Sequence, residues 1–193
     1  MKKTFITIYC FLVFYALPVN ALCTDELVLI LETSSGETRF CQGSSFSITA
    51  RGFHGDEVLV GHRWESPTEG LIARTEGPYA LIEAREAGAH KITYYGTDDQ
   101  GNHASISITI EVLPNPISEI EISKSFFTRL FNRDFPQKLQ SLQQQEDYQY
   151  AWYLNNEWMA HTATFRANQP GRYRLVITSS QGCRSYSQPL TIP

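Results

Sequence analysis

The sequence contains little that would build a catalytic or metal-binding site. Its five histidines, at positions 54, 62, 90, 103 and 161, are scattered and form no H-x-x-x-H pair, the spacing that places two zinc ligands on one helix face. No serine stands in a nucleophile elbow, and Cys183 follows a glycine with no base nearby in sequence. These absences predict a protein that is not an enzyme and carries no cofactor.

Positive charge is also scarce, and long apolar runs are missing after the N-terminus. Lys2 and Lys3, an uncharged run over 4–17, and a small residue at Ala21 follow the order of a secretory signal peptide. The run is shorter than the ~20 residues of a spanning helix, so we predict cleavage of residues 1–21 and no transmembrane span in the mature chain. Without the two lysines, 14 basic residues face 20 acidic ones, a net charge near −6, which argues against nucleic acid as a partner.

Cysteine is rare, and its usage fits export to an oxidising compartment. Cys10 lies in the signal peptide, which leaves Cys23, Cys41 and Cys183, an odd number. Cys23 and Cys41 bracket an extended, hairpin-like stretch, so this pair is the first choice for a disulfide. The alternative is a bond between Cys41 and Cys183, which would join distant parts of the chain.

What the mature sequence does contain is short runs of β-forming residues separated by turn residues, the pattern of a sandwich or barrel. Strands are expected over 25–32, 44–50, 58–64, 79–84 and 91–95, and the isoleucines at 106, 108 and 110 alternate with polar residues. Pro114 and Pro116 interrupt this pattern and favour an extended connection. The predicted organisation is therefore a first β-sandwich over 22–113, a linker over 114–116 and a second β-sandwich over 117–193.

The second half offers the clearest hairpin. Tyr150, Trp152 and Leu154 alternate along one face of a strand, and Asn155 and Asn156 are suited to the positive φ angles of a tight turn. Further strands are expected over 172–178 and 190–192. The segment 125–135 instead has apolar residues at a spacing closer to that of a helix, which leaves a short helix and an irregular edge segment as the two alternatives.

The two halves end alike, which indicates one unit used twice. Each has an upstream tryptophan, then a glycine two residues before His90 or Tyr173, then a Gln-Gly pair before Asn102 or Cys183. The stretch YYGTDDQGNHAS at 94–105 resembles the ends of PKD-like and hyalin-repeat-like modules. The stretches YAWYLNN at 150–156, PGRY at 170–173, QGC at 181–183 and CQG at 41–43 resemble the immunoglobulin-like repeats of bacterial surface proteins.

This resemblance implies an all-β fold of two tandem immunoglobulin-like modules, and it suggests roles for several residues. Trp64 and Trp152 would be core tryptophans on a central strand, and Tyr173 would form a tyrosine corner. His90 takes the tyrosine's place in the first module, a departure that weakens the corner there. Such repeats often pair an early cysteine with the one after the late glycine, but Asn102 holds that late place in the first module. Cys41 then lacks its usual partner, which again favours Cys23.

Two groups of residues are candidate binding sites. Asp98, Asp99 and Asn102 gather oxygen atoms of the kind that Ca²⁺ binds, although the same residues are common in turns without a metal, and we favour the turn. Tyr153 points away from Trp152 on its strand, and Trp158 lies just across the Asn155–Asn156 turn. Tyr153 and Trp158 are the stronger candidate, because exposed aromatic rings stack on sugars or anchor protein partners. The alternative is that Trp158 packs on the core.

Taken together, these features predict a non-catalytic exported bacterial protein, located in the periplasm, at the cell surface or outside the cell. The expected role is a protein-interaction or adhesion module of the envelope or surface, with a protein partner. The alternative is a carbohydrate-binding module for an extracellular glycan that uses the exposed aromatics around Trp158.

Overall fold

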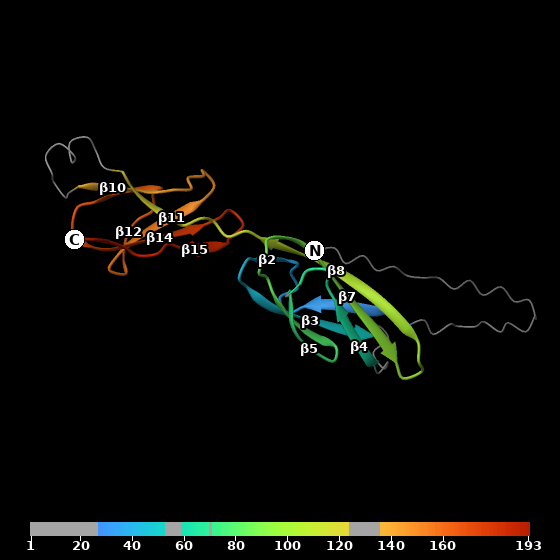
Figure 1. Ribbon diagram of the computed structural model, residues 1–193. Helices are drawn as coiled ribbons and strands as arrows, with labels where there is room; N and C mark the ends of the chain where they lie inside the picture. Colours follow the sequence, from blue (N-terminus) through green and yellow to red (C-terminus); the bar gives the residue numbers. More distant parts are fainter. Residues whose placement is uncertain (1–26, 53–58, 70, 124–135) are drawn as a thin grey trace, which may run out of the picture.

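The computed structural model describes residues 27–52, 59–69, 71–123 and 136–193, and in these residues every regular element is a β-strand (Figure 1). The all-β fold predicted from the sequence is confirmed. The predicted signal peptide over 1–21, the helical spacing over 125–135 and Cys23 lie outside the described residues.

Strands β1 to β8 form an N-terminal module of two sheets. One sheet has the order β1 (Leu29–Thr33), β3 (Ser45–Gly52), β6 (Tyr79–Glu83), β5 (Ile72–Glu76), and the other has the order β2 (Arg39–Cys41), β8 (His103–Leu113), β7 (Gly88–Asp98), β4 (Leu59–Glu65). All neighbours are antiparallel except β2 and β8, which are parallel. If β2 is left aside, the first, second, fifth and fourth of the remaining strands form one sheet, and the third, sixth and seventh form the other. This is the strand arrangement of an immunoglobulin-like sandwich.

The core of this module lies between the two sheets and follows from the alternation of each strand. Ile48 and Ile82 point inward from one sheet and Ile92 and Ile110 from the other, all with no exposed surface. Because successive side chains of a strand point to opposite faces, the polar residues between them lie in solvent. This is the burial predicted from the alternating isoleucines.

Strands β9 to β16 form a C-terminal module, end to end with the first (Figure 1). One sheet has the order β13 (Thr164–Ala167), β10 (Gln137–Ser141), β9 (Ile120–Ser123), and the other has the order β12 (Glu157–Ala160), β11 (Gln149–Leu154), β14 (Gly171–Thr178), β15 (Arg184–Tyr186), with β16 (Leu190–Ile192) also pairing with β14. Trp152, Tyr173, Leu175 and Ile177 fill the space between the sheets and are fully buried.

The hairpin of β11 and β12 confirms the predicted turn. Asn155 and Asn156 have φ angles of 50° and 72°, the left-handed values that a two-residue hairpin of this kind requires and that asparagine tolerates best among residues with a side chain. The turn returns β12 along β11 and places Trp158 directly opposite Tyr153.

Each module has a side chain that closes the corner before its long strand. The hydroxyl of Tyr173 donates to the carbonyl of Gln169 over 2.6 Å, and Nε2 of His90 lies 2.8 Å from the carbonyl of Glu86. In both cases the acceptor is four residues upstream, the geometry of a tyrosine corner. His90 also bonds to the Thr68 hydroxyl through Nδ1 over 2.9 Å. The histidine therefore makes the same bond that the tyrosine makes, and the weakened corner expected in this module is not observed.

The two tryptophans that the resemblance pairs occupy different environments. Trp152 lies on β11, between two neighbouring strands, and its indole N–H donates to the carbonyl of Thr162 over 2.7 Å. Trp64 lies on β4, which is an edge strand, and it is only partly buried against Tyr94, with ring centroids 4.7 Å apart. The expectation of a central strand is wrong for Trp64, because no strand of the described residues pairs with the outer side of β4.

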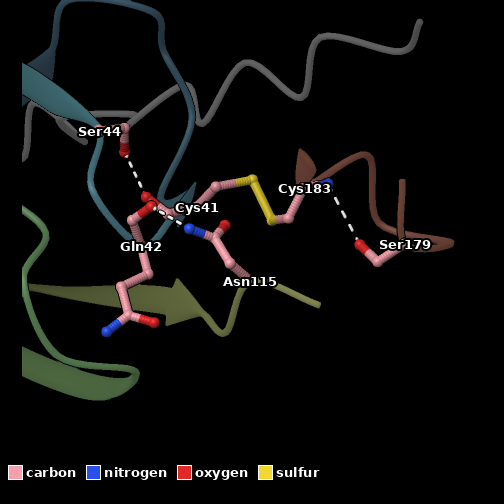
Figure 2. Close-up of a disulfide and its surroundings, with 6 residues drawn as sticks. All are labelled: Cys41, Gln42, Ser44, Asn115, Ser179 and Cys183. Carbon is pink, nitrogen blue, oxygen red and sulfur yellow. Dashed lines mark hydrogen bonds between the residues drawn. A yellow bond between two sulfur atoms is a disulfide. The ribbon is translucent and has the colours of Figure 1, made fainter. Parts of the chain in front are cut away.

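The cysteine pairing expected first, between Cys23 and Cys41, is also wrong. Cys41 is bonded to Cys183, which leaves no sulfur valence for Cys23 (Figure 2). The reason is topological. Cys41 ends β2, which runs parallel to the end of β8, so it lies where the chain leaves the N-terminal module. Asn115 donates to the Gln42 carbonyl over 2.8 Å at the same place, and the bond therefore ties the modules together beside their linker.

Candidate binding site

A shallow hollow lies on the outer face of the sheet β12-β11-β14-β15, and the strand register explains it. Three rows of outward side chains cross β11 and β14, and the middle row contains Ala151 opposite Val176. The rows on either side contain larger residues on β11, Tyr153 in one row and Gln149 in the other. Because neighbouring rows on one face are about 7 Å apart, small residues between large ones leave a depression. The open cavity has a volume of about 440 Å³.

Two tyrosines that point outward from the sheet border this hollow. Tyr153 is half-buried on β11, and Tyr186 lies on β15 directly opposite Val176 with 59% of its surface exposed. Rings held at the rim of an open hollow offer flat apolar faces to a ligand, and the hydroxyl group of a tyrosine can form a hydrogen bond with it.

Two arginines stand at opposite ends of the same hollow. Arg174 is opposite Tyr153 on β14, and Arg184 is opposite Thr178 on β15. Both line the cavity, and no Asp or Glu lines it. The hollow is therefore an electropositive site on a chain whose overall charge is negative.

The charge on these arginines is not neutralised by nearby carboxylates in the described part of the chain. In the N-terminal module, each described arginine pairs with a glutamate at 2.5 to 3.8 Å: Arg39, Arg51, Arg63, Arg74 and Arg85. Among residues 136–193, by contrast, Arg166, Arg172, Arg174 and Arg184 make no such pair with a described carboxylate. The only negatively charged side chains in that range are those of Glu146, Asp147 and Glu157.

The corresponding face of the N-terminal module provides a comparison. It also has a hollow, lined by His62, Arg63, Tyr95 and His103 among others. There, however, Arg63 lies over the Tyr95 ring at 4.1 Å and pairs with Glu65 at 3.3 Å. Its guanidinium group is thus already occupied by the protein itself, and this face has less capacity for an external anion.

The two aromatic residues predicted as a binding face lie on the same side of the sheet, because residues directly opposite each other in a strand pair share a face. Trp158 has 54% of its surface exposed and does not pack on the core. It does not line the hollow, but its ring lies 4.7 Å from that of His161, which does. The sequence reasoning missed Tyr186, Arg174 and Arg184. The alternation of Arg174, Val176 and Thr178 on the predicted strand over 172–178 could have identified one of them.

In the turn that was considered as a calcium site, the Asp98 carboxylate forms hydrogen bonds within the turn itself. Oδ1 of Asp98 accepts hydrogen bonds from the N–H groups of Gln100 and Asn102 at 2.9 and 2.7 Å, and Oδ2 accepts from the Asn102 side-chain amide at 2.8 Å. Burial raises the pKa of this carboxyl, but the hydrogen bonds from Asn102, Gln100 and Gly101 outweigh it, so the pKa is lowered. Asp99 is exposed.

The same turn recurs in the C-terminal module without a carboxylate. Ser179 takes the place of Asp98, and its Oγ accepts from the N–H of Cys183 over 3.1 Å (Figure 2). Gly101 and Gly182 have φ angles of 88° and 87°. A shared turn with a different side chain at its first position favours a structural role for Asp98. In the described part of the chain, no three His, Cys, Asp or Glu side chains are placed to hold a metal ion together.

The described residues include no helix that is long and apolar enough to cross a membrane.

Comparison with known proteins gives similarity at the level of fold. No family model matches the sequence, and no curated protein matches it. Among solved structures, murine CEACAM1b has 10% sequence identity and a TM-score of 0.39, with 86% of this chain and 99% of that chain covered. The fibronectin(III)-like modules of Clostridium thermocellum CbhA have 12% identity and a TM-score of 0.39, with 84% and 91% covered. A Bacteroides ovatus glucan utilization protein, SGBP-B, has 12% identity and a TM-score of 0.32, with 83% and 44% covered. Similarity this low does not extend to function.

Proposed function

We propose that this chain is a non-catalytic, exported bacterial protein that acts as an interaction or adhesion module of the cell envelope or surface. The observation that carries the proposal is the hollow on the outer face of β11, β14 and β15, where exposed aromatic rings stand beside arginines that pair with no carboxylate of the described residues. Aromatic and arginine side chains are the residues most often responsible for binding energy at protein interfaces. A protein partner docking on this face is the first candidate.

The disulfide supports this role because it limits how the modules can turn relative to each other. With Cys41 bonded to Cys183 beside the linker, the modules have two covalent connections at one place. A binding face held in a fixed orientation loses less conformational entropy when it meets a surface.

A carbohydrate ligand is the second candidate, favoured by one specific observation. Tyr153, Trp158 and Tyr186 all lie on this one face, and Trp158 and Tyr186 are each more than half exposed. Such rings can stack on the flat apolar face of a sugar.

The test is a cross-linking pull-down with the tagged mature chain from its own cells, with partners identified by mass spectrometry. Tyr186→Ala is compared with Tyr79→Ala, because the two tyrosines are 59% and 54% exposed and lie on different modules. We expect a partner protein or glycoconjugate to be recovered in stable proportion with the wild type and with Tyr79→Ala, and to be lost with Tyr186→Ala. Equal recovery with both variants would contradict a binding role for this face.

A further inference from the structure

We propose that the hollow on the C-terminal module binds an anionic saccharide, one that carries carboxylate or sulfate groups on a chain of sugar rings. This inference rests on the proposed role of the chain as a binding module. It develops the second candidate of that proposal, a carbohydrate ligand, and names the chemical class of that ligand at the same site. It is carried by the side chains of Arg174, Arg184, Tyr153 and Tyr186 and by the strand register that places them.

The first step concerns charge. Arg174 and Arg184 both line the hollow, no acidic residue lines it, and neither arginine pairs with a carboxylate in the described part of the chain. A guanidinium group presents a planar fork of donors that matches the oxygens of a carboxylate or sulfate. An anion bound here would supply the partner that the glutamates supply to every described arginine of the N-terminal module.

The second step concerns spacing. Arg174 and Arg184 stand at opposite ends of the hollow, four residues apart along the register, which corresponds to roughly 13 Å. Tyr186 stands between them, opposite Val176. This order of positive charge, aromatic ring and positive charge fits an extended ligand that has an anionic group at each end and a flat apolar ring between. An oligosaccharide with acidic residues has that arrangement.

The third step separates a saccharide from an acidic peptide. The floor of the hollow is the middle of a sheet, where β11 and β14 pair with each other from Gln149 to Leu154 and from Tyr173 to Thr178. Their backbone groups are already used, so a peptide cannot be added here as another strand. The remaining polar groups are side chains such as Gln149, Asn156 and Thr178, which bond to hydroxyl groups without requiring a peptide backbone.

The experiment is binding of the full mature chain to an array in which each carboxylated or sulfated oligosaccharide is printed beside its neutral core. The best acidic ligand and its neutral core are then titrated by calorimetry. We expect the acidic form to bind at least about tenfold more tightly, as charge-assisted hydrogen bonds require, and to lose affinity as salt is raised.

The test variant is R174Q/R184Q, and the matched control is R166Q/R172Q, which removes the same charge from exposed arginines that do not line the hollow. We expect the test variant to lose about tenfold or more in affinity and the control to stay within about twofold. Tyr186→Ala should also weaken binding, because the ring is exposed and its removal does not disturb the core. Thermal melting of each variant checks that it is folded.

Three results would overturn the proposal: no acidic saccharide preferred over its neutral core, equal losses in the test and control variants, or binding of a short poly-glutamate in place of saccharides. In each case, a partner protein that is recovered with the wild type and lost with Tyr186→Ala would leave the proposed interaction function standing. If the chain neither prefers an acidic saccharide nor recovers a partner that depends on Tyr186, the proposed function and the proposed ligand are both wrong.

Discussion

The disulfide between Cys41 and Cys183 is the feature whose removal should have the largest effect. It closes a loop with a sequence separation of 142 residues, and a loop of that length corresponds to about 5 kcal/mol of stabilisation through the lost entropy of the unfolded chain. This value applies when the whole loop unfolds in one step. If the modules unfold separately, each transition contains a smaller share of it.

The perturbation is the double variant C41S/C183S, which removes both sulfurs of the bond so that neither partner is left as a thiol. Two assays are informative: urea unfolding followed by tryptophan fluorescence, and small-angle X-ray scattering of the folded protein. We expect a lower unfolding midpoint and a broader distribution of distances, because only the linker and contacts such as that of Asn115 with Gln42 then hold the modules. Peptide mapping of the wild type without reduction should recover the Cys41–Cys183 cross-link. An unfolding free energy and a scattering profile equal to those of the wild type would refute the reasoning.

Three further predictions concern local structure. Tyr173→Phe removes the buried corner hydrogen bond and should lower the free energy of unfolding by about 1 kcal/mol, measured by thermal melting. Gly171→Ala places a Cβ against Leu154 at a φ angle of 151° and should cost about 1–3 kcal/mol in urea unfolding, whereas Gly36→Ala, with open space around it, should cost less. The pKa of Asp98 is lowered in the folded state, so its stabilising effect should be complete above the ordinary carboxyl pKa of about 3.9 and lost as the pH falls through the lowered value. In Asp98→Asn, the free energy of unfolding should therefore fall less steeply as the pH is lowered through this range. An unchanged pH dependence would contradict the assignment.

The register of the long strands could be predicted because alternation is a local property. The isoleucines of β8 and the aromatic residues of β11 repeat every second residue, and each pattern has one buried face. The positive φ angles at Asn155 and Asn156 could also be predicted, since two adjacent asparagines between alternating strands favour that turn.

Two of the short strands, β10 and β15, were not predicted. β10 has one fully buried apolar residue, Leu139, among polar neighbours, and β15 has none. Such strands form because a neighbouring strand provides hydrogen-bond partners for their backbone. A stretch of three to five residues contains no pattern from which that neighbour can be predicted. For the same reason Tyr186 and Arg184, both on β15, could not be recognised as part of a binding face.

The sequence by itself determined that the fold is all-β, that two similar units follow each other, and that aromatic residues lie near the Asn155–Asn156 turn. These properties depend on residues close together in the chain. Only the tertiary structure decided that Cys41 bonds to Cys183, that Trp64 lies on an edge strand, and that Arg174 and Arg184 face one hollow. Each of these depends on which strands become neighbours in a sheet, and strand order is set by the packing of the whole sandwich rather than by any local pattern.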